Sequence, residues 1–193
     1  NINCYNDTPP SSAYYLSAGQ DGLRHQALVD NTSMANSAGG DALADSDITG
    51  VLGEMGKYAV NPEQCAMVCD ISTYLNGFLK LTNVTTWDKI RDMAVVLTGQ
   101  LAAYRGIPII PSASMGLATS DGTVDTSGNT LGHLVVVNRN MWYVGFRRNL
   151  LIEVDRDIQR RQYIMVVSLR EAVGAHGTRA SNTHTGLVYN IQV

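Results

Sequence analysis

The hydrophobic periodicity of this chain changes from helical to strand-like along its length, and this change restricts the folds that it can adopt. In the first half, apolar side chains recur at i, i+3, i+4 and i+7, at Ile48, Val51, Leu52 and Met55. That spacing predicts an amphipathic helix, which Asn61-Pro62 ends. In the second half, apolar runs such as 134–137 and 163–169 are short and rich in β-branched residues, which is typical of strands. Helices followed by strands predict an α+β fold class.

Capping residues predict how the first half is organised. Residues 1–46 are rich in Asn, Ser, Gly and Asp, so we expect a long loop there. Ser46 or Asp47 is expected to cap the first helix by accepting backbone N–H bonds. The apolar residues 66–71 predict a buried strand, and Ser72 is expected to cap a second helix.

Glycine and proline positions predict the organisation of the middle of the chain. A third, weaker helix is expected over 87–93. Gly106 predicts a tight turn, and Pro108 predicts that the following strand lies at a sheet edge, because proline donates no ladder hydrogen bond. The Gly/Ser/Thr-rich segments 116–133 and 174–185 predict exposed loops.

Charge and cysteine content exclude some classes of function. The chain carries 14 Lys and Arg against 17 Asp and Glu, a formal net charge of −3, which argues against wrapping nucleic acid as the main task. Three cysteines provide no disulfide framework. No run of about 20 apolar residues exists that would span a membrane. The chain opens at Asn1 without a signal peptide or initiator Met, so we expect a processed or excised product.

Residue types that often carry chemistry do not form a catalytic or metal-binding pattern. Cys65 and Cys69 are four residues apart, but they lack a second Cys or His pair and are expected to be buried thiols. The histidines are expected to be solvated or to contact other subunits: His25, His133, His176 and His184. No G-x-S-x-G motif is present. Residues 50–57 faintly resemble a phosphate loop, but Val51 replaces the first glycine and Tyr58 replaces the Mg²⁺-binding hydroxyl residue.

Several segments, taken in order, resemble the tailed-bacteriophage major capsid proteins, whose fold is named after phage Hong Kong 97. The central segment is TGQLAAYRGIPIIPSASM, residues 98–115. Before it, GKYAVNP at 56–62 is followed by a strand and Ser72-Thr73-Tyr74; after it come the strands of 151–171 around an acidic-basic turn and a closing strand at 186–193. The resemblance covers most of the chain from about residue 45 onward.

The resemblance implies the Hong Kong 97-like fold, with an axial domain and part of a peripheral domain. Residues 1–58 would supply a peripheral loop and helix, 59–147 the axial domain, and 148–176 the peripheral strands. Residues 177–193 would supply the closing loop and strand of the axial domain. The family's N-terminal arm, extended loop and spine helix would precede this chain. Some members cross-link a lysine to an asparagine, but Gln162 occupies the matching position here, so we do not expect that reaction.

The function implied is that of a coat subunit, which is not an enzyme and has no cofactor. It would form pentamers and hexamers and close the icosahedral head around double-stranded DNA. Scaffold, portal or decoration proteins would be further partners, and the resemblance implies no membrane. The protein would assemble in the host bacterial cytoplasm and remain in the virion.

Charged residues around a predicted hairpin tip, together with one tryptophan, are the candidates for contacts between subunits. The candidates are Arg147, Arg148, Asp155, Arg156, Asp157, Arg160, Arg161 and Trp142. A solvated hairpin tip would explain the charges equally simply, since exposed ion pairs stabilise little. Opposite charges side by side can also set the register between partners.

Two other functions remain open from the sequence. Encapsulin nanocompartments, which enclose cargo proteins, share the implied fold. A hydrolase that uses loop Ser and His residues is the third alternative, although no motif supports it.

Overall fold

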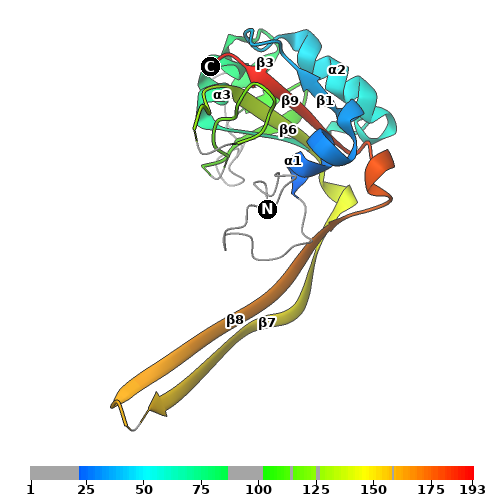
Figure 1. Cartoon of the computed structure of the whole chain (residues 1–193). Helices are drawn as coiled ribbons and strands as arrows, with labels where there is room; N and C mark the ends of the chain where they lie inside the picture. Colours follow the sequence, from blue (N-terminus) through cyan, green and yellow to red (C-terminus); the bar gives the residue numbers. More distant parts are fainter. Residues whose placement is uncertain (1–21, 87–101, 114, 125–126, 158) are drawn as a thin grey trace.

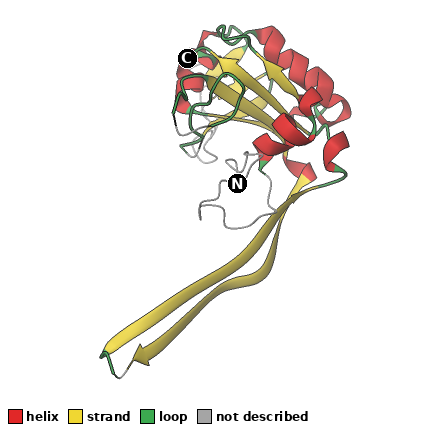
Figure 2. Ribbon diagram, in the orientation of Figure 1, coloured by secondary structure: helices red, strands yellow, loops and turns green. Residues whose placement is uncertain are grey.

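The computed structural model describes residues 22–86, 102–113, 115–124, 127–157 and 159–193. They form a body of one sheet with helices packed against it, and a long β-hairpin that extends away from that body (Figure 1). Strands and helices are both present, which confirms the α+β fold class (Figure 2). In the described part of the chain, no helix is long and apolar enough to cross a membrane.

The sheet of the body has the strand order β1-β9-β6-β2-β5-β4-β3. Its strands are β1 (Ala35–Ser37), β2 (Cys65–Cys69), β3 (Val84–Thr86), β4 (Ala102–Tyr104), β5 (Ile107–Pro111), β6 (Gly132–Asn138) and β9 (Thr185–Ile191). The pairs β1/β9 and β2/β5 are parallel, and the other neighbours are antiparallel. Strand β6 is buried at every residue, as expected for its β-branched sequence at the centre of the sheet.

The helical segments are short, and they begin earlier in the chain than predicted. They are α1 (Leu23–His25), η1 (Gln26–Asp30), η2 (Thr32–Met34), α2 (Asp45–Met55), η3 (Gly56–Tyr58), η4 (Pro62–Gln64), α3 (Ile71–Asn76), η5 (Phe78–Lys80), η7 (Arg139–Met141) and η8 (Arg179–Ser181). The prediction of one loop over 1–46 is therefore wrong from Leu23 onward. Buried Ala27 and Met34 anchor this segment in the core, and strand β1 follows it. Residues 1–21 lie outside the described residues.

The predicted amphipathic helix is confirmed as α2, but its cap differs. Ala44 is the N-cap residue, and its N–H donates to the Asp47 carboxylate at 3.0 Å, so Asp47 acts from inside the first turn. The buried side chains of α2 include Ile48 and Val51, which face the sheet. Gly186 on β9 permits this close approach, because a Cβ there would lie 2.1 Å from Val51 Cγ1.

The second predicted helix is confirmed as α3, with Asp70 rather than Ser72 at its N-cap. The Asp70 carboxylate accepts the Thr73 N–H at 3.0 Å and also the Thr73 hydroxyl. The cap forms earlier than predicted because β2 ends at Cys69 and the buried Asp70 takes the extended conformation. The third predicted helix, over 87–93, lies outside the described residues.

The prediction that Pro108 marks a sheet edge is wrong, because β5 lies between β2 and β4. A two-residue turn at Arg105-Gly106, with φ values of 48° and 85°, joins β4 to β5. Pro108 pairs with Ala103 beside this turn, and the pairing with β2 begins one residue later, at Ile109. Pro108 thus lies before the hydrogen-bonded pairing of β5 with β2, where a backbone N–H would have been needed.

Candidate self-assembly surface

The hairpin of β7 (Trp142–Asp157) and β8 (Gln162–Ala175) is the main candidate for a functional surface. Among the described strands, these two pair only with each other. At about 3.3 Å per residue, β7 would span about 50 Å. Figure 1 shows the hairpin extending as a two-stranded ribbon with its tip far from the body. We refer to residues 142–175 as the arm.

Large apolar side chains are exposed along the whole arm. They are Tyr143, Val144, Phe146, Leu150, Leu151, Ile152, Val154, Tyr163, Ile164, Met165, Val166 and Val167. The exposed fraction reaches 76% at Tyr163 and 66% at Met165. A two-stranded ribbon has no second layer to cover its side chains and is marginally stable alone. An apolar surface of this length therefore indicates a surface that residues outside the described part of the chain cover.

The register of the hairpin divides its outer half into two different faces. Residues directly opposite each other across an antiparallel pair point to the same face. One face carries Ile152, Val154, Arg156, Tyr163, Met165 and Val167, which form the rungs Ile152↔Val167, Val154↔Met165 and Arg156↔Tyr163. The other carries Leu151, Glu153, Asp155, Ile164, Val166 and Ser168. We call the first the apolar face and the second the mixed face.

The root of the arm is anchored to the body around Thr185, at the start of β9. Trp142 Nε1 donates to Thr185 Oγ1 at 2.9 Å, and the Trp142 ring packs edge-on against His184, with 5.8 Å between ring centroids. His184 also packs edge-on against Tyr58 at 5.9 Å. Directly after β8, the N–H of His176 donates to the Met141 carbonyl at 2.8 Å. These contacts fix the direction in which the arm leaves the body.

Burial favours the neutral form of the His184 imidazole at this root. Burial lowers its pKa, and this effect exceeds the opposing effect of backbone hydrogen bonds. Its Nε2 lies 3.2 Å from the His176 carbonyl oxygen and its Nδ1 lies 3.0 Å from Thr185 Oγ1. Because a carbonyl only accepts, the proton is assigned to Nε2, and the Thr185 hydroxyl can donate to Nδ1.

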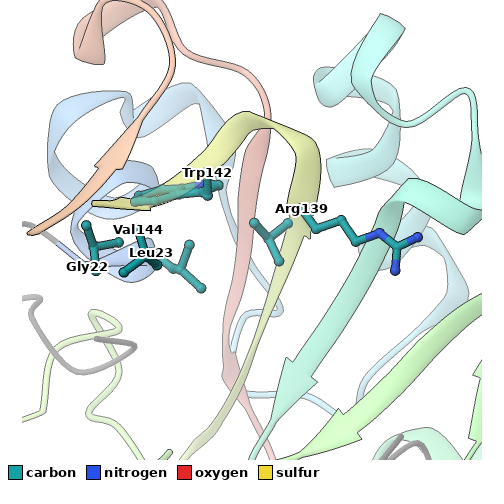
Figure 3. Close-up of a pocket in the computed structure, with 7 residues that line it drawn as sticks. Gly22, Leu23, Arg139, Trp142 and Val144 are labelled. Carbon is teal, nitrogen blue, oxygen red and sulfur yellow. The ribbon is translucent and has the colours of Figure 1, made fainter. Parts of the chain in front are cut away.

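A pocket of about 280 Å³ lies beside the root. Its lining residues are Gly22, Leu23, Val137, Arg139, Trp142, Val144 and Val173. Figure 3 shows the Arg139 guanidinium pointing away from the other labelled side chains. The lining is therefore apolar and contains no second titratable group, so the pocket holds no acid–base pair.

The structure brings the predicted tip charges together at the outer end of the arm. Arg156 is exposed and its guanidinium lies 5.9 Å from the centre of the Tyr163 ring. Asp155 accepts the N–H of Arg156 at 2.7 Å. Arg160 and Arg161 are exposed in the turn, where Arg161 has a φ of 53°.

The other predicted interface residues are spread along the arm, from its tip to its root. Asp157 ends β7 at the tip. Arg147 is exposed about a third of the way along β7, and Arg148 lies between two register shifts in the same strand. Trp142 is separate from all of these, because it is half-buried in the root of its own chain. The exposed apolar side chains were not identified as a surface, and the alternation of apolar and charged residues over 152–155 is the local signal that could have revealed part of it.

The buried thiols are confirmed, but the expectation for the histidines is partly wrong. Cys65 and Cys69 are buried free thiols, and burial raises the pKa of Cys69 to about 12. His133 and His184 are almost fully buried. Strand β6 begins at Gly132, inside the segment predicted as a loop, and so includes His133, whereas His184 directly precedes β9 and packs between Tyr58 and Trp142. Burial, with a contribution from the Arg24 charge, lowers the pKa of His133 to about 3. Among the described residues, no group of His, Cys, Asp or Glu is arranged to hold a metal ion.

Comparison with known proteins gives three relevant similarities. No family model matches the chain. It is 29% identical over 170 residues to the "Putative prophage capsid protein YqbE" of Bacillus subtilis (strain 168). This alignment covers 85% of the chain and 49% of the relative, so the chain spans about half the length of the curated relative that it matches.

The solved structures extend this likeness to the fold. A chain from Mycobacterium phage Che8 superposes with a TM-score of 0.52 at 17% identity, covering 87% of this chain and 57% of that one. A chain from the capsid of an empty GTA particle, computed with C5 symmetry, gives a TM-score of 0.50 at 11% identity, with 90% and 57% covered. The predicted resemblance to phage capsid proteins is confirmed: this chain has the α+β fold found in these phage and GTA-particle structures.

Proposed function

We propose that this chain is part of a major capsid protein, a shell subunit that assembles with copies of itself. The head shell would enclose double-stranded DNA without reading its sequence. The capsid-named relative and the shared fold support this proposal. The observation that carries it is the arm, whose exposed apolar side chains require a covering surface.

Pentamers and hexamers are the proposed assemblies. Head-to-tail contacts between different surfaces of one subunit generate rings when the rotation closes. The arm suits such contacts because it extends away from the body and its tip lies far from it (Figure 1). Scaffold, portal and decoration proteins are proposed as further partners, with assembly in the host cytoplasm and a final location in the virion. The role is structural, not enzymatic.

The domain division is also part of the proposal. Residues 59–147 and 177–193 would form the axial domain, and 1–58 and 148–176 would belong to the peripheral domain. The arm begins at Trp142, six residues before the proposed boundary. The contacts of Trp142 with β9 support the assignment of the root to the axial side.

The tip charges are proposed to set the register between neighbouring subunits. Opposite charges alternate at Asp155, Arg156 and Asp157, and the exposed Arg160 and Arg161 follow in the turn. Such charges reject wrong partners more than they add affinity. Arg147 and Arg148 are proposed to serve the same purpose further along the arm.

A charge-reversal experiment tests the proposed function. The double variant Arg160→Glu/Arg161→Glu should reduce the yield of capsomers or shells at least tenfold, while circular dichroism of the monomer stays unchanged. Lys80→Glu, an exposed reversal on the body, is the matched control and should assemble normally. Sizing chromatography and negative-stain images provide the measurement. Equal assembly of both variants would remove the tip charges from the mechanism, and failure of the unaltered full-length protein to assemble would contradict the shell function.

The encapsulin-like alternative is not favoured by the comparisons, which name a prophage capsid protein and a GTA-particle capsid. Mass spectrometry of material that co-purifies with assembled particles would distinguish genome from cargo enzyme. The hydrolase alternative gains no support from the pocket, whose lining contains one charged residue.

A further inference from the structure

The outer edge of β8 is a feature that the proposed function alone does not explain. Residues 162–169, with the sequence QYIMVVSL, contain no charge, no proline and no glycine. Within the described chain, they pair with β7 on one side and with nothing on the other. An uncharged edge with high β-propensity is a template for another strand.

The two edges of the arm differ in how well they are protected against pairing. Strand β7 contains six charged residues, and its pairing is interrupted by register shifts between Phe146 and Arg148 and between Arg148 and Leu151. Charges and bulges are the usual devices that prevent an edge from pairing. The outer half of β8 has neither, and the whole arm lacks proline and lysine. The β8 edge is therefore the one suited to adding a strand.

We propose that β8 of one copy pairs edge to edge, antiparallel, with β8 of a second copy around a twofold axis, giving a four-stranded sheet. This inference rests on the proposed function and names one interface of the shell.

The charge distribution favours β8 of a second copy as the strand that pairs with the free edge of β8. A twofold axis brings a strand against its own residues in reverse order. On β7 such pairing would place Glu153 and Asp155 close to their own copies, and like charges opposite each other destabilise a sheet. On β8, residues 162–169 meet only uncharged residues if the axis lies near their middle.

The same axis makes the two apolar faces continuous. For antiparallel strands, the twofold runs perpendicular to the sheet, so both copies present the same face to the same side. Residues that pair must then share a face, and one residue pairs with its own copy. With the axis at Val166, Met165 pairs with Val167 of the second copy, and Ile164 with Ser168. The apolar face then extends over both arms as one surface.

Disulfide cross-linking locates this axis directly. In a Cys4→Ser background of the full chain, single cysteines are placed in turn at each position of 164–168 and oxidised. The native Cys65 and Cys69 do not interfere, because both are buried and burial raises their pKa. Only a residue beside the twofold brings two copies of its Cβ within disulfide distance. We expect covalent dimer to peak at one of Met165, Val166 or Val167.

Cysteines on β7 provide the matched controls for this scan. Ile152→Cys and Val154→Cys lie opposite Val167 and Met165 on the same face. They should give less than a tenth of the covalent dimer that the best position on β8 gives. Equal dimer from both strands, or a maximum on β7, would overturn the proposal.

A second measurement compares one substitution on the two strands of the same rung. Val167→Lys should weaken self-association at least tenfold in sedimentation velocity, because it places two like charges beside the axis. Ile152→Lys, directly opposite on the apolar face, should change it by less than about threefold. Equal losses would mean that stacking of apolar faces, and not edge pairing, joins the copies.

The outcomes separate this inference from the proposed function. Shell-like particles without cross-linking at β8 would overturn the inference and leave the shell function standing. Dimers that cross-link at β8 but never form larger assemblies would support the inference and contradict the shell function. A protein that stays monomeric at all concentrations would contradict both.

Discussion

The contact between α2 and β9 allows a quantitative test of how the body is packed. In Gly186→Ala, the new Cβ would lie 2.1 Å from Val51 Cγ1, closer than real Cβ contacts occur. The next atoms are Val51 Cβ at 3.6 Å and Met34 Cε at 3.7 Å, both at ordinary contact distance. One methyl group of Val51 therefore carries the whole conflict. Overpacking of this kind costs about 1–3 kcal/mol of stability.

The compensating substitution removes that conflict. Val51→Ala deletes two buried methyl groups and should cost about 2 kcal/mol, from transfer and residual cavity together. In the double variant, the methyl group added at position 186 occupies part of the space that Val51 vacates. The double variant should therefore be more stable than the sum of the two single losses by about 1–2 kcal/mol.

Urea unfolding followed by circular dichroism measures this coupling between Gly186 and Val51. The slope of the unfolding free energy against urea concentration should be the same for the unaltered protein, the two single variants and the double variant. The midpoints of unfolding then report stability. Additive losses, within about 0.5 kcal/mol, would refute the argument that helix α2 rests on β9 through Val51. A Gly186→Ala variant as stable as the unaltered protein would refute it as well.

Two further predictions concern buried polar groups. Since burial depresses the pKa of His133 from 6.5 to about 3, the folded protein binds fewer protons than the unfolded chain at acid pH, so stability is complete above about pH 6.5 and falls as the pH decreases toward 3. From pH 6.5 to pH 5.0 this loss of stability is at most about 2 kcal/mol. His133→Leu should reduce the slope of stability against pH, measured by chemical denaturation, and an unchanged slope would show that another group causes the pH dependence. Trp142→Phe keeps an aromatic ring at the arm root but removes the donor to Thr185, which should lower stability by about 1 kcal/mol. Thr185→Val in the Trp142→Phe background should then cost less than it does alone, and strictly additive losses would show that the bond contributes nothing.

Local sequence signals correctly predicted the helices and strands whose burial pattern is encoded within a few neighbouring residues. The spacing of Ile48, Val51, Leu52 and Met55 specified α2, because one apolar stripe fits one buried face. The β-branched run from Leu134 to Val137 specified β6 for a similar reason, since a strand buried on both faces needs no alternation.

Features that depend on distant partners were not predicted correctly. The place of β5 inside the sheet depends on where pairing with β2 begins, at Ile109, and Pro108 alone does not encode that. The burial of His133 depends on β6 starting at Gly132, within a segment whose composition is typical of a loop. The cap of α3 lies at Asp70 and not at Ser72, because tertiary pairing of β2 decides where the turn starts.

The candidate surface was predicted in part. The charges at the tip stand out in the sequence, whereas the apolar side chains of the arm look like ordinary strand core. What distinguishes them is the absence of a covering layer among the residues that the structure describes, and that is a property of the folded chain.

The anchoring of Trp142 and His184 at the root has a mechanical consequence for curvature. For an arm of about 50 Å, at about 3.3 Å per residue, a rotation of about 10° at the root displaces the tip by about 9 Å. In the proposed shell, a small repacking around Thr185 would therefore change the angle between adjacent subunits substantially. The aromatic cluster at the base of this lever is thus positioned to determine how flat or how bent a surface built from these subunits becomes.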